Sequence, residues 1–198
     1  MKNLDYNYIC TVIGNLTGIP IRLYRDNRQI FYHSLVHLPQ DPITAFREDI
    51  LAIDAHVGYY ITPYFHYYGI VGDGENKIVI GPSIQTANTE QALRELAFKC
   101  DVPPDDTADF ITGMKSIVSM PLDSILQILC TMNYIMNGEK LGLGDIIIYD
   151  AEQEDLKAKS EKERAKINFD RDLAAIQGQQ NIHNTLALEQ TIVNFVRR

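Results

Sequence analysis

The residues best suited to chemistry gather between His56 and Ser83. In the middle of this stretch His66 stands among five tyrosines, which are Tyr59, Tyr60, Tyr64, Tyr67 and Tyr68. Such rings offer stacking surface with polar tips, as the walls of small-molecule pockets and protein interfaces do. Aromatic rings on neighbouring strands also stabilise a sheet without binding anything, so the pattern leaves both interpretations open. If the cluster binds a ligand, the candidate residues are Tyr60, Tyr64, His66 and Tyr68.

Two glycine-containing motifs resemble catalytic or phosphate-binding sequences only in part. The run from Gly81 to Gln85, GPSIQ, has the first half of the G-x-S-x-G turn of hydrolases but lacks the second glycine. The run Gly142-Leu143-Gly144 lacks the third glycine of a dinucleotide-binding loop, and a strand-like segment follows it where that loop needs a helix. We therefore expect that the chain is not an enzyme and that Ser83 is not a nucleophile.

The histidines and cysteines do not form a recognisable metal site. His33 and His37 are four residues apart, as two ligands on a helix would be, but the residues before His33 favour an extended chain and Pro39 follows. The three cysteines contain no C-x-x-C pair, and they are Cys10, Cys100 and Cys130. We expect no metal, no cofactor and no disulfide, and reduced thiols favour a cytoplasmic location.

Length, composition and charge indicate a globular protein. The chain has 198 residues, of which 45% are hydrophobic, and its formal net charge is -8. The whole excess of acidic residues lies within 1–150, so this region is not expected to bind a nucleic-acid backbone, which needs a concentrated positive face. The sequence contains neither a secretory signal at its N-terminus nor a run of about 18 apolar residues. We expect a cytoplasmic protein that does not enter a membrane.

The tyrosine cluster is predicted to lie on a β-meander. Aromatic and β-branched runs separated by turn residues predict strands over 57–61, 66–72 and 77–82. An earlier hairpin is predicted over 19–24 and 29–33, turning at Asp26-Asn27. Alternation along the second meander strand puts Tyr67 and Tyr68 on opposite faces, and neither face is cleanly polar. We expect about five antiparallel strands with both faces of the sheet covered.

Apolar residues at helical spacing predict the helices around this sheet. The predicted segments are 4–16, 41–53, 89–100, a helix after Pro103-Pro104 that reaches about Val118, and 121–137. Asn3 is a plausible N-cap of the first helix, and Gly18 follows its end. We expect the 4–16 and 121–137 helices to flank the sheet. The segment from Asp145 to Asp150 fits either a last strand or an apolar connector.

The composition changes after residue 150. Residues 152–166 are mostly charged, which favours a solvated helix or linker, and apolar residues resume helical spacing over 183–198. We therefore predict a sensor-like α+β domain over 1–150 and a C-terminal charged helical extension over 151–198. Because the apolar stripe is still running at Arg198, we expect the natural chain to continue into a further domain.

Several short motifs together resemble a known family. They are the run from Thr62 to Gly69, the strand end Ile80-Gly81-Pro82, and the pieces Asn181-Ile182-His183-Asn184, Glu189-Gln190 and Val196-Arg197. Together they resemble the N-terminal region of AraC-type transcriptional regulators from Firmicutes. In that family such a region precedes two helix-turn-helix motifs that bind DNA, and it is regarded as the sensing or dimerising part. The DNA-binding part is absent from this sequence.

This resemblance implies a function and a set of partners. It implies a ligand-sensing or dimerisation domain of a bacterial transcription regulator, with a PAS- or GAF-like α+β fold. The expected partners are a small-molecule effector and a second copy of the chain, with DNA bound only through the missing C-terminal domain. The alternative is a structural dimerisation domain that binds no small molecule.

Overall fold

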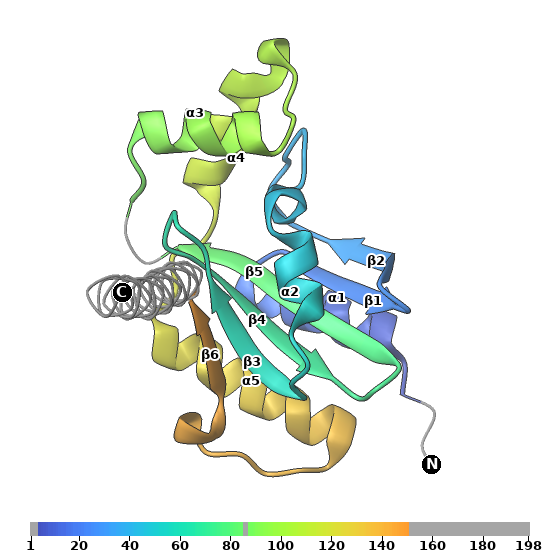
Figure 1. The fold of residues 1–198 in the computed structure, drawn as a ribbon. Coiled ribbons are helices and arrows are strands. Elements are labelled where there is room, and N and C mark those ends of the chain that lie inside the picture. The colour runs from blue at the N-terminus through green and yellow to red at the C-terminus, as the bar shows by residue number, and fades with distance from the viewer. Residues whose placement is uncertain (1–3, 85–86, 151–198) are drawn as a thin grey trace, which may run out of the picture. The chain divides into compact units, whose positions relative to one another are not determined.

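The centre of the molecule is a six-stranded sheet, which the computed structural model shows within the residues it describes, 4–84 and 87–150. The strand order is β2-β1-β5-β4-β3-β6 (Figure 1). The strands are β1 (Ile21–Arg25), β2 (Arg28–His33), β3 (Val57–Ile61), β4 (His66–Gly72), β5 (Asn76–Ile84) and β6 (Ile147–Asp150). The first five pair antiparallel, as predicted, whereas β6 runs parallel to β3. The sheet is therefore mixed, and the segment that the sequence left open as a strand or a connector supplies the sixth strand.

Local sequence explains the two tight turns of the sheet. Asp26 and Asn27 adopt φ of 51° and 59° between β1 and β2, a left-handed conformation that short polar side chains tolerate in two-residue hairpins. Between β4 and β5, Gly74 has a φ of 101°. There the carboxylate of Asp73 accepts hydrogen bonds from the backbone N–H groups of Glu75 and Asn76. Both turns lie between strands that the sequence predicted.

One face of the sheet is covered by α1 (Tyr6–Thr17) and α5 (Leu122–Asn137), which lie behind it in Figure 1. The N-cap of α1 is Asp5, whose side chain accepts a hydrogen bond from the Tyr8 backbone N–H. The predicted cap, Asn3, lies outside the described residues. Gly18 and Gly138 end the two helices in the left-handed conformation, with φ of 70° and 71°. The apolar stripes of both helices pack on the sheet in one hydrophobic core.

The described residues contain six shorter helical segments, of which five lie away from this first face. The other face of the sheet is covered mainly by η1 (Pro42–Ala45), α2 (Arg47–Ala52), α3 (Glu90–Lys99) and α4 (Thr107–Ser116), with η2 (Pro104–Asp106) leading into α4. The predicted helix over 41–53 is broken at Phe46, whose φ of -134° and ψ of 9° are not helical. The final segment, η3 (Leu143–Asp145), connects α5 to β6. The 4–16 and 121–137 helices were expected to flank the sheet, and both flank the same face.

The described residues fall within one structural unit, which runs from Met1 to Glu152. The predicted charged linker and helix over 151–198 lie outside the described residues. Among the described helices, none combines the length and the apolar character needed to cross a membrane. The described part of the chain is thus an α+β sheet with a separate hydrophobic core on each face.

Candidate functional site

The four predicted site residues meet on the face of the sheet covered by η1, α2, α3 and α4. Tyr60 on β3 pairs directly with Tyr68 on β4, so the two rings share a face. His66 begins β4 two residues before Tyr68 and therefore points to the same face. Tyr64 lies in the turn between the two strands. Tyr60, His66 and Tyr68 are buried, and Tyr64 is half-buried.

Phe46 joins these rings into one aromatic cluster. Its ring centroid lies 6.3 Å from that of Tyr60 and 6.1 Å from that of Tyr64. The ring of Tyr64 lies 6.2 Å from the imidazole of His66. These separations are typical of aromatic pairs that attract one another through their edges. The sequence did not single out Phe46, because the residue sits in an apolar helical pattern and reaches the site only after the helix breaks there.

His66 is a neutral imidazole with one unused nitrogen. Its Nε2 atom is hydrogen-bonded to the side-chain amide nitrogen of Asn88. Because the amide nitrogen donates, Nε2 accepts and the ring proton belongs on Nδ1. Nδ1 is buried and has no hydrogen-bond partner within 4–84 and 87–150. Burial lowers the pKa of His66 to about 4, so the ring is uncharged at neutral pH.

Tyr68 places a second unused polar atom on this face. The side chain is fully buried, yet its hydroxyl has no hydrogen-bond partner among the described residues. Burial raises the pKa of Tyr68 well above 10, so the hydroxyl keeps its proton. A buried hydroxyl without a partner is destabilising, because folding removes its hydrogen bonds to water and provides no hydrogen bond within the protein. Native proteins contain a few such groups per hundred residues, and each one needs a specific explanation.

Arg22 lies beside Tyr68 and was missed by the sequence analysis. It is fully buried on β1, and its Nε and Nη2 atoms donate to the two carboxylate oxygens of Asp41, with Nε 2.6 Å from Oδ2. Its Nη1 atom donates to the backbone carbonyl of Gly81. The guanidinium carbon lies 6.0 Å from the ring centroid of Tyr68. Burial opposes the charge of Arg22, but Asp41 outweighs this effect and the pKa stays above its ordinary value.

A signal for Arg22 does exist in the sequence. The arginine interrupts the apolar run Ile19 to Tyr24, and alternation puts it on the same face as Tyr24. A charged residue inside a strand with two covered faces needs a buried partner. The sequence does not identify that partner, because Asp41 is nineteen residues away and belongs to the start of η1.

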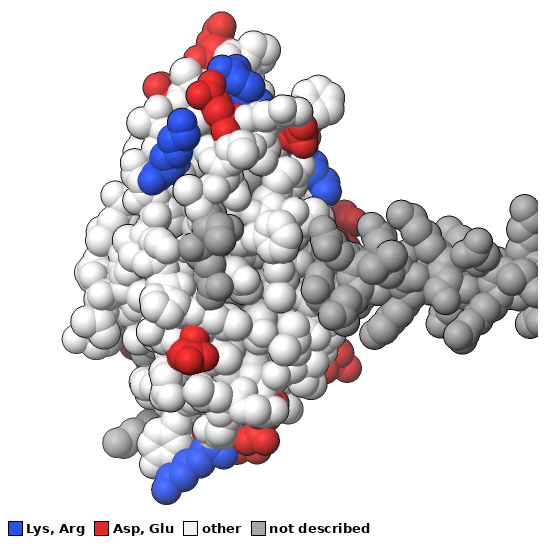
Figure 2. All heavy atoms as spheres, turned by 90° about the vertical axis from the view of Figure 1, so that its left-hand side faces the viewer, with Lys and Arg blue, Asp and Glu red and all other residues white. Residues whose placement is uncertain are grey.

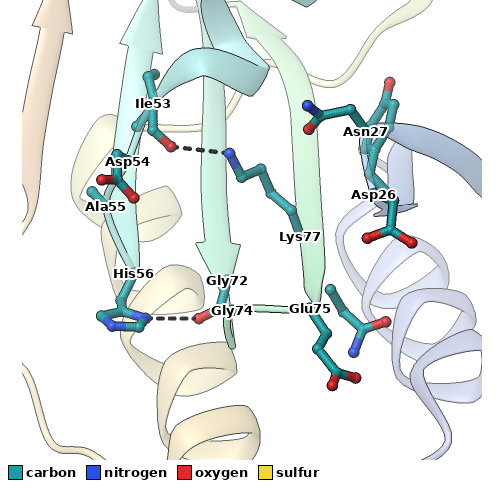
Figure 3. A pocket seen from close by; sticks show the side chains of 12 residues that line it. Asp26, Asn27, Ile53, Asp54, Ala55, His56, Gly72, Gly74, Glu75 and Lys77 are labelled. Carbon is teal, nitrogen blue, oxygen red and sulfur yellow. Dashed lines mark hydrogen bonds between the residues drawn. The ribbon is translucent and has the colours of Figure 1, made fainter.

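A separate cavity of about 270 Å³ lies at the opposite ends of β4 and β5 and is lined by other residues (Figure 3). Its walls come from the two sheet turns and from the segment after α2. Lys77 reaches across it, and its Nζ atom donates to the carbonyls of Leu51 at 2.7 Å and Ile53 at 2.9 Å. Burial lowers the pKa of Lys77, although Asp54 opposes the shift. The ammonium is therefore engaged in holding the end of α2 to the sheet.

The other motifs considered in the sequence have structural positions. Ser83 is buried within β5 and pairs with Tyr67, so strand register puts it on the opposite face from His66. His33 lies at the end of β2 rather than on a helix, and its Nε2 atom is 2.8 Å from the side-chain oxygen of Asn15. Within the described ranges, no three His, Cys, Asp or Glu side chains are placed to hold a metal ion.

The connection between β3 and β4 and the end of β5 lie on the left-hand side of Figure 1, which is the side that faces the viewer in Figure 2. Charged side chains on this face gather toward the top, over α3 and α4, and near the lower edge (Figure 2). The area between them carries few charges. The surface nearest to this end of the sheet is thus mainly uncharged.

The arrangement can bind a molecule by hydrogen bonds and ring contacts. His66 contacts Asn88 rather than Ser83, so the described residues of this cluster do not form a nucleophile with its base. In comparisons with known proteins, no family model matches the chain and no curated protein matches it.

Proposed function

We propose that residues 1–150 form a ligand-sensing domain of a bacterial transcription regulator of AraC type, and that the domain also dimerises. In this proposal the fold is PAS- or GAF-like and the domain is cytoplasmic and not catalytic. DNA is bound by a separate domain outside this chain, as the family resemblance implies. The α+β architecture supports the fold assignment, with five consecutive antiparallel strands in the order β2-β1-β5-β4-β3 and helices on both faces.

The observation that carries the proposal is that two buried polar atoms on one face of the sheet, His66 Nδ1 and Tyr68 Oη, have no hydrogen-bond partner among the described residues. They lie on the face where the sequence placed the ligand site, beside the rings of Tyr60 and Tyr64. A third such atom, Ser83 Oγ, lies on the opposite face. Such atoms do not stabilise a hydrophobic core. Replacing each by an apolar group would remove a desolvation penalty and make the fold more stable. A bound molecule that satisfies both His66 Nδ1 and Tyr68 Oη recovers that free energy.

A ligand at this position can affect α3 through a series of side chains in contact. Phe46 contacts Tyr60 and Tyr64, and it also lies 4.7 Å beneath the ammonium of Lys99 at the end of α3. A molecule that moves Tyr64 therefore changes the packing of Phe46 against α3. Such a change shifts the domain between two states only by the difference in ligand affinity for the two states.

The proposal is tested by thermal unfolding of the 198-residue chain in the presence of a library of bacterial metabolites. A true ligand at a hundred times its Kd adds about 2.7 kcal/mol and raises Tm by roughly 5 to 10 °C. The rise is expected to shrink strongly in His66→Gln and to persist in His37→Gln, since His37 is exposed. If no compound raises Tm, or if every active compound stabilises all three proteins equally, the sensor site is wrong.

The alternative, a structural dimerisation domain without a ligand, is favoured by a different feature. Tyr8, Val12 and Leu16 recur every four residues along α1 and are 67%, 41% and 80% exposed. They form an apolar stripe on the outside of the helix, next to the stripe that is buried against the sheet. A second copy of the chain that packs on this stripe would bury it.

This alternative predicts that Leu16→Glu shifts the molecular mass measured by sedimentation from dimer to monomer. The matched variant Phe98→Glu, at an 86% exposed residue of α3, is expected to leave the mass unchanged. A dimer of equal stability in both variants would exclude the α1 stripe as the interface. A dimer that depends on Leu16, together with no ligand in the metabolite library, would favour the structural role.

A further inference from the structure

We propose that the site on β4 takes a small uncharged planar molecule with an acceptor oxygen, such as an amide or ketone on a ring. This inference rests on the proposed function, because it names the class of ligand for the same site. It follows from the donors that the site offers, from the charges around them and from the side chains beside them.

His66 Nδ1 and Tyr68 Oη, which have no partner among the described residues, are both able to donate a hydrogen bond. Since Asn88 donates to Nε2 of His66, the imidazole proton is on Nδ1. The hydroxyl of Tyr68 keeps its proton and can donate or accept. Both side chains lie on the same face of β4, two residues apart along the strand. A carbonyl oxygen accepts two hydrogen bonds, so one acceptor group can serve either donor or both.

The charged groups of the site are already neutralised. Each of the three nitrogens of Arg22 is hydrogen-bonded, two to Asp41 and one to the carbonyl of Gly81. An anionic ligand would therefore have to break this network to gain a cation, and a cationic ligand would have to take Asp41 from Arg22. Leaving either partner buried and alone is expensive. His66 adds no charge, because it stays neutral down to a pH of about 4.

The side chains beside the two donors are largely apolar. On one side are the rings of Phe46 and Tyr64, which meet at an interplanar angle of 61°. On the sheet side, Ile84 of β5 pairs directly with His66 and belongs to the same hydrophobic core. A planar ring can stack on the ring of Tyr64 or His66.

Two partly exposed side chains separate His66 from the surface. Tyr64 and Asn88 both contact the imidazole, and neither is fully buried. We infer that these two side chains would have to move for a ligand to reach Nδ1. The surface at this end of the sheet carries few charges (Figure 2), which suits the entry of an uncharged molecule.

The test uses three probes of nearly equal shape and different charge: benzamide, which is neutral, benzoate, which is an anion, and benzamidine, which is a cation. Each is titrated to 20 mM into the isotope-labelled 198-residue chain at pH 7, and the NMR signals of the His66 and Tyr68 rings are followed. We expect benzamide to shift both sets of signals and to bind at least tenfold more tightly than the two charged probes. Loss of a neutral hydrogen bond costs about 1 kcal/mol, so Tyr68→Phe is expected to weaken benzamide roughly fivefold.

Tyr24→Phe is the matched control, because Tyr24 lies on the same face but its hydroxyl already donates to Gln29 at 3.1 Å. Its affinity for benzamide is expected to equal that of the unmodified chain. Equal binding of benzamide by Tyr68→Phe and Tyr24→Phe would overturn the assignment of donors. Tighter binding of benzoate or benzamidine at His66 would overturn the uncharged class and leave the sensor proposal standing. If none of the probes shifts the His66 and Tyr68 signals, this inference fails, and the sensor proposal is then decided separately by the metabolite library.

Discussion

The two faces of the sheet are built from the same strands and differ in what they bury. The face under α1 and α5 is packed closely enough that Gly69 on β4 has no room for a side chain, since an added Cβ would lie 2.5 Å from Leu129 of α5. The face under η1, α2, α3 and α4 buries an arginine, a histidine and several tyrosine hydroxyls. Both cores are mostly apolar, but one face packs against long helices, whereas the other, which we call the polar face, buries a charged side chain and several tyrosine hydroxyls under shorter helical segments.

This difference indicates that the two faces have different roles, one in stability and one in response to a ligand. Close apolar packing stabilises a fold in one arrangement, because any displacement loses contacts along the whole interface. Short helical segments over a core that contains unpartnered polar atoms are easier to rearrange, since fewer contacts hold each of them. We infer that the α1 and α5 face carries the stability and that the opposite face can respond to a ligand.

The largest expected effect comes from breaking the buried ion pair of the polar face. Arg22→Ala leaves the carboxylate of Asp41 and the carbonyl of Gly81 without their donor, so we expect a loss of about 3 to 5 kcal/mol in the free energy of unfolding. The control, Arg25→Ala, removes an exposed arginine of the same strand and is expected to cost about 1 kcal/mol or less. Urea unfolding measures both. Equal losses would mean that this pair does not hold the polar face together.

The second effect is a dependence of stability on pH that belongs to the polar face alone. The pKa of His66 is about 4 in the folded chain and 6.5 when exposed, so between these values the unfolded chain holds a proton that the folded chain lacks. Stability therefore falls as the pH drops from about 6.5 toward 4. The loss at pH 4.5 is about 2 to 3 kcal/mol relative to pH 7.

His66→Gln is expected to remove this part of the pH dependence. The measurement is the urea midpoint of both proteins at pH 7 and pH 4.5. The difference between the two proteins isolates His66, because the other titrating groups are shared. If both proteins lose the same stability on acidification, His66 is not buried as a neutral ring.

The third effect tests the close packing of the other face. Gly69→Ala forces a methyl group into contact with Leu129 and Ile80, so we expect a loss of about 1 to 3 kcal/mol from overpacking. Gly144→Ala is the control, because an added Cβ there meets nothing within 4 Å. Thermal unfolding compares the two variants. A Gly69 variant as stable as the Gly144 variant would show that this face has more freedom than its contacts indicate.

The smallest effect separates a used hydroxyl from an unused one on the polar face. Tyr24→Phe removes the hydrogen bond to Gln29 and is expected to cost about 0.5 to 1.5 kcal/mol. Tyr68→Phe removes a buried hydroxyl that has no partner among the described residues, so it is expected to leave the stability unchanged or to raise it by up to about 1 kcal/mol. The measurement is the urea midpoint of Tyr24→Phe, Tyr68→Phe and the unmodified chain in the absence of ligand. A loss at Tyr68 as large as at Tyr24 would reveal a partner for its hydroxyl.

Local patterns in the sequence predicted most elements because their causes are local. Strand alternation, the turn residues Asp26-Asn27 and the helix-ending residue Gly18 act over a few neighbours and were predicted correctly. The predicted helix over 41–53 failed at Phe46, because the aromatic ring packs with Tyr60 and Tyr64 at the expense of helix continuity. The sequence did not decide whether 145–150 forms a strand, because β6 forms by pairing with β3, which is distant in the chain.

The residues of the candidate site also form two groups, those that the sequence predicted and those that only the structure revealed. The sequence by itself determined that Tyr60, Tyr64, His66 and Tyr68 would share one neighbourhood, since a meander and its two-residue alternation are enough to place them. Only the tertiary structure decided that Arg22 and Asp41 complete this neighbourhood and that His66 and Tyr68 retain unused polar atoms. The reason is physical: a strand pattern shows which face a side chain takes, but its hydrogen-bond partners come from segments far away in the chain, and only folding brings them together.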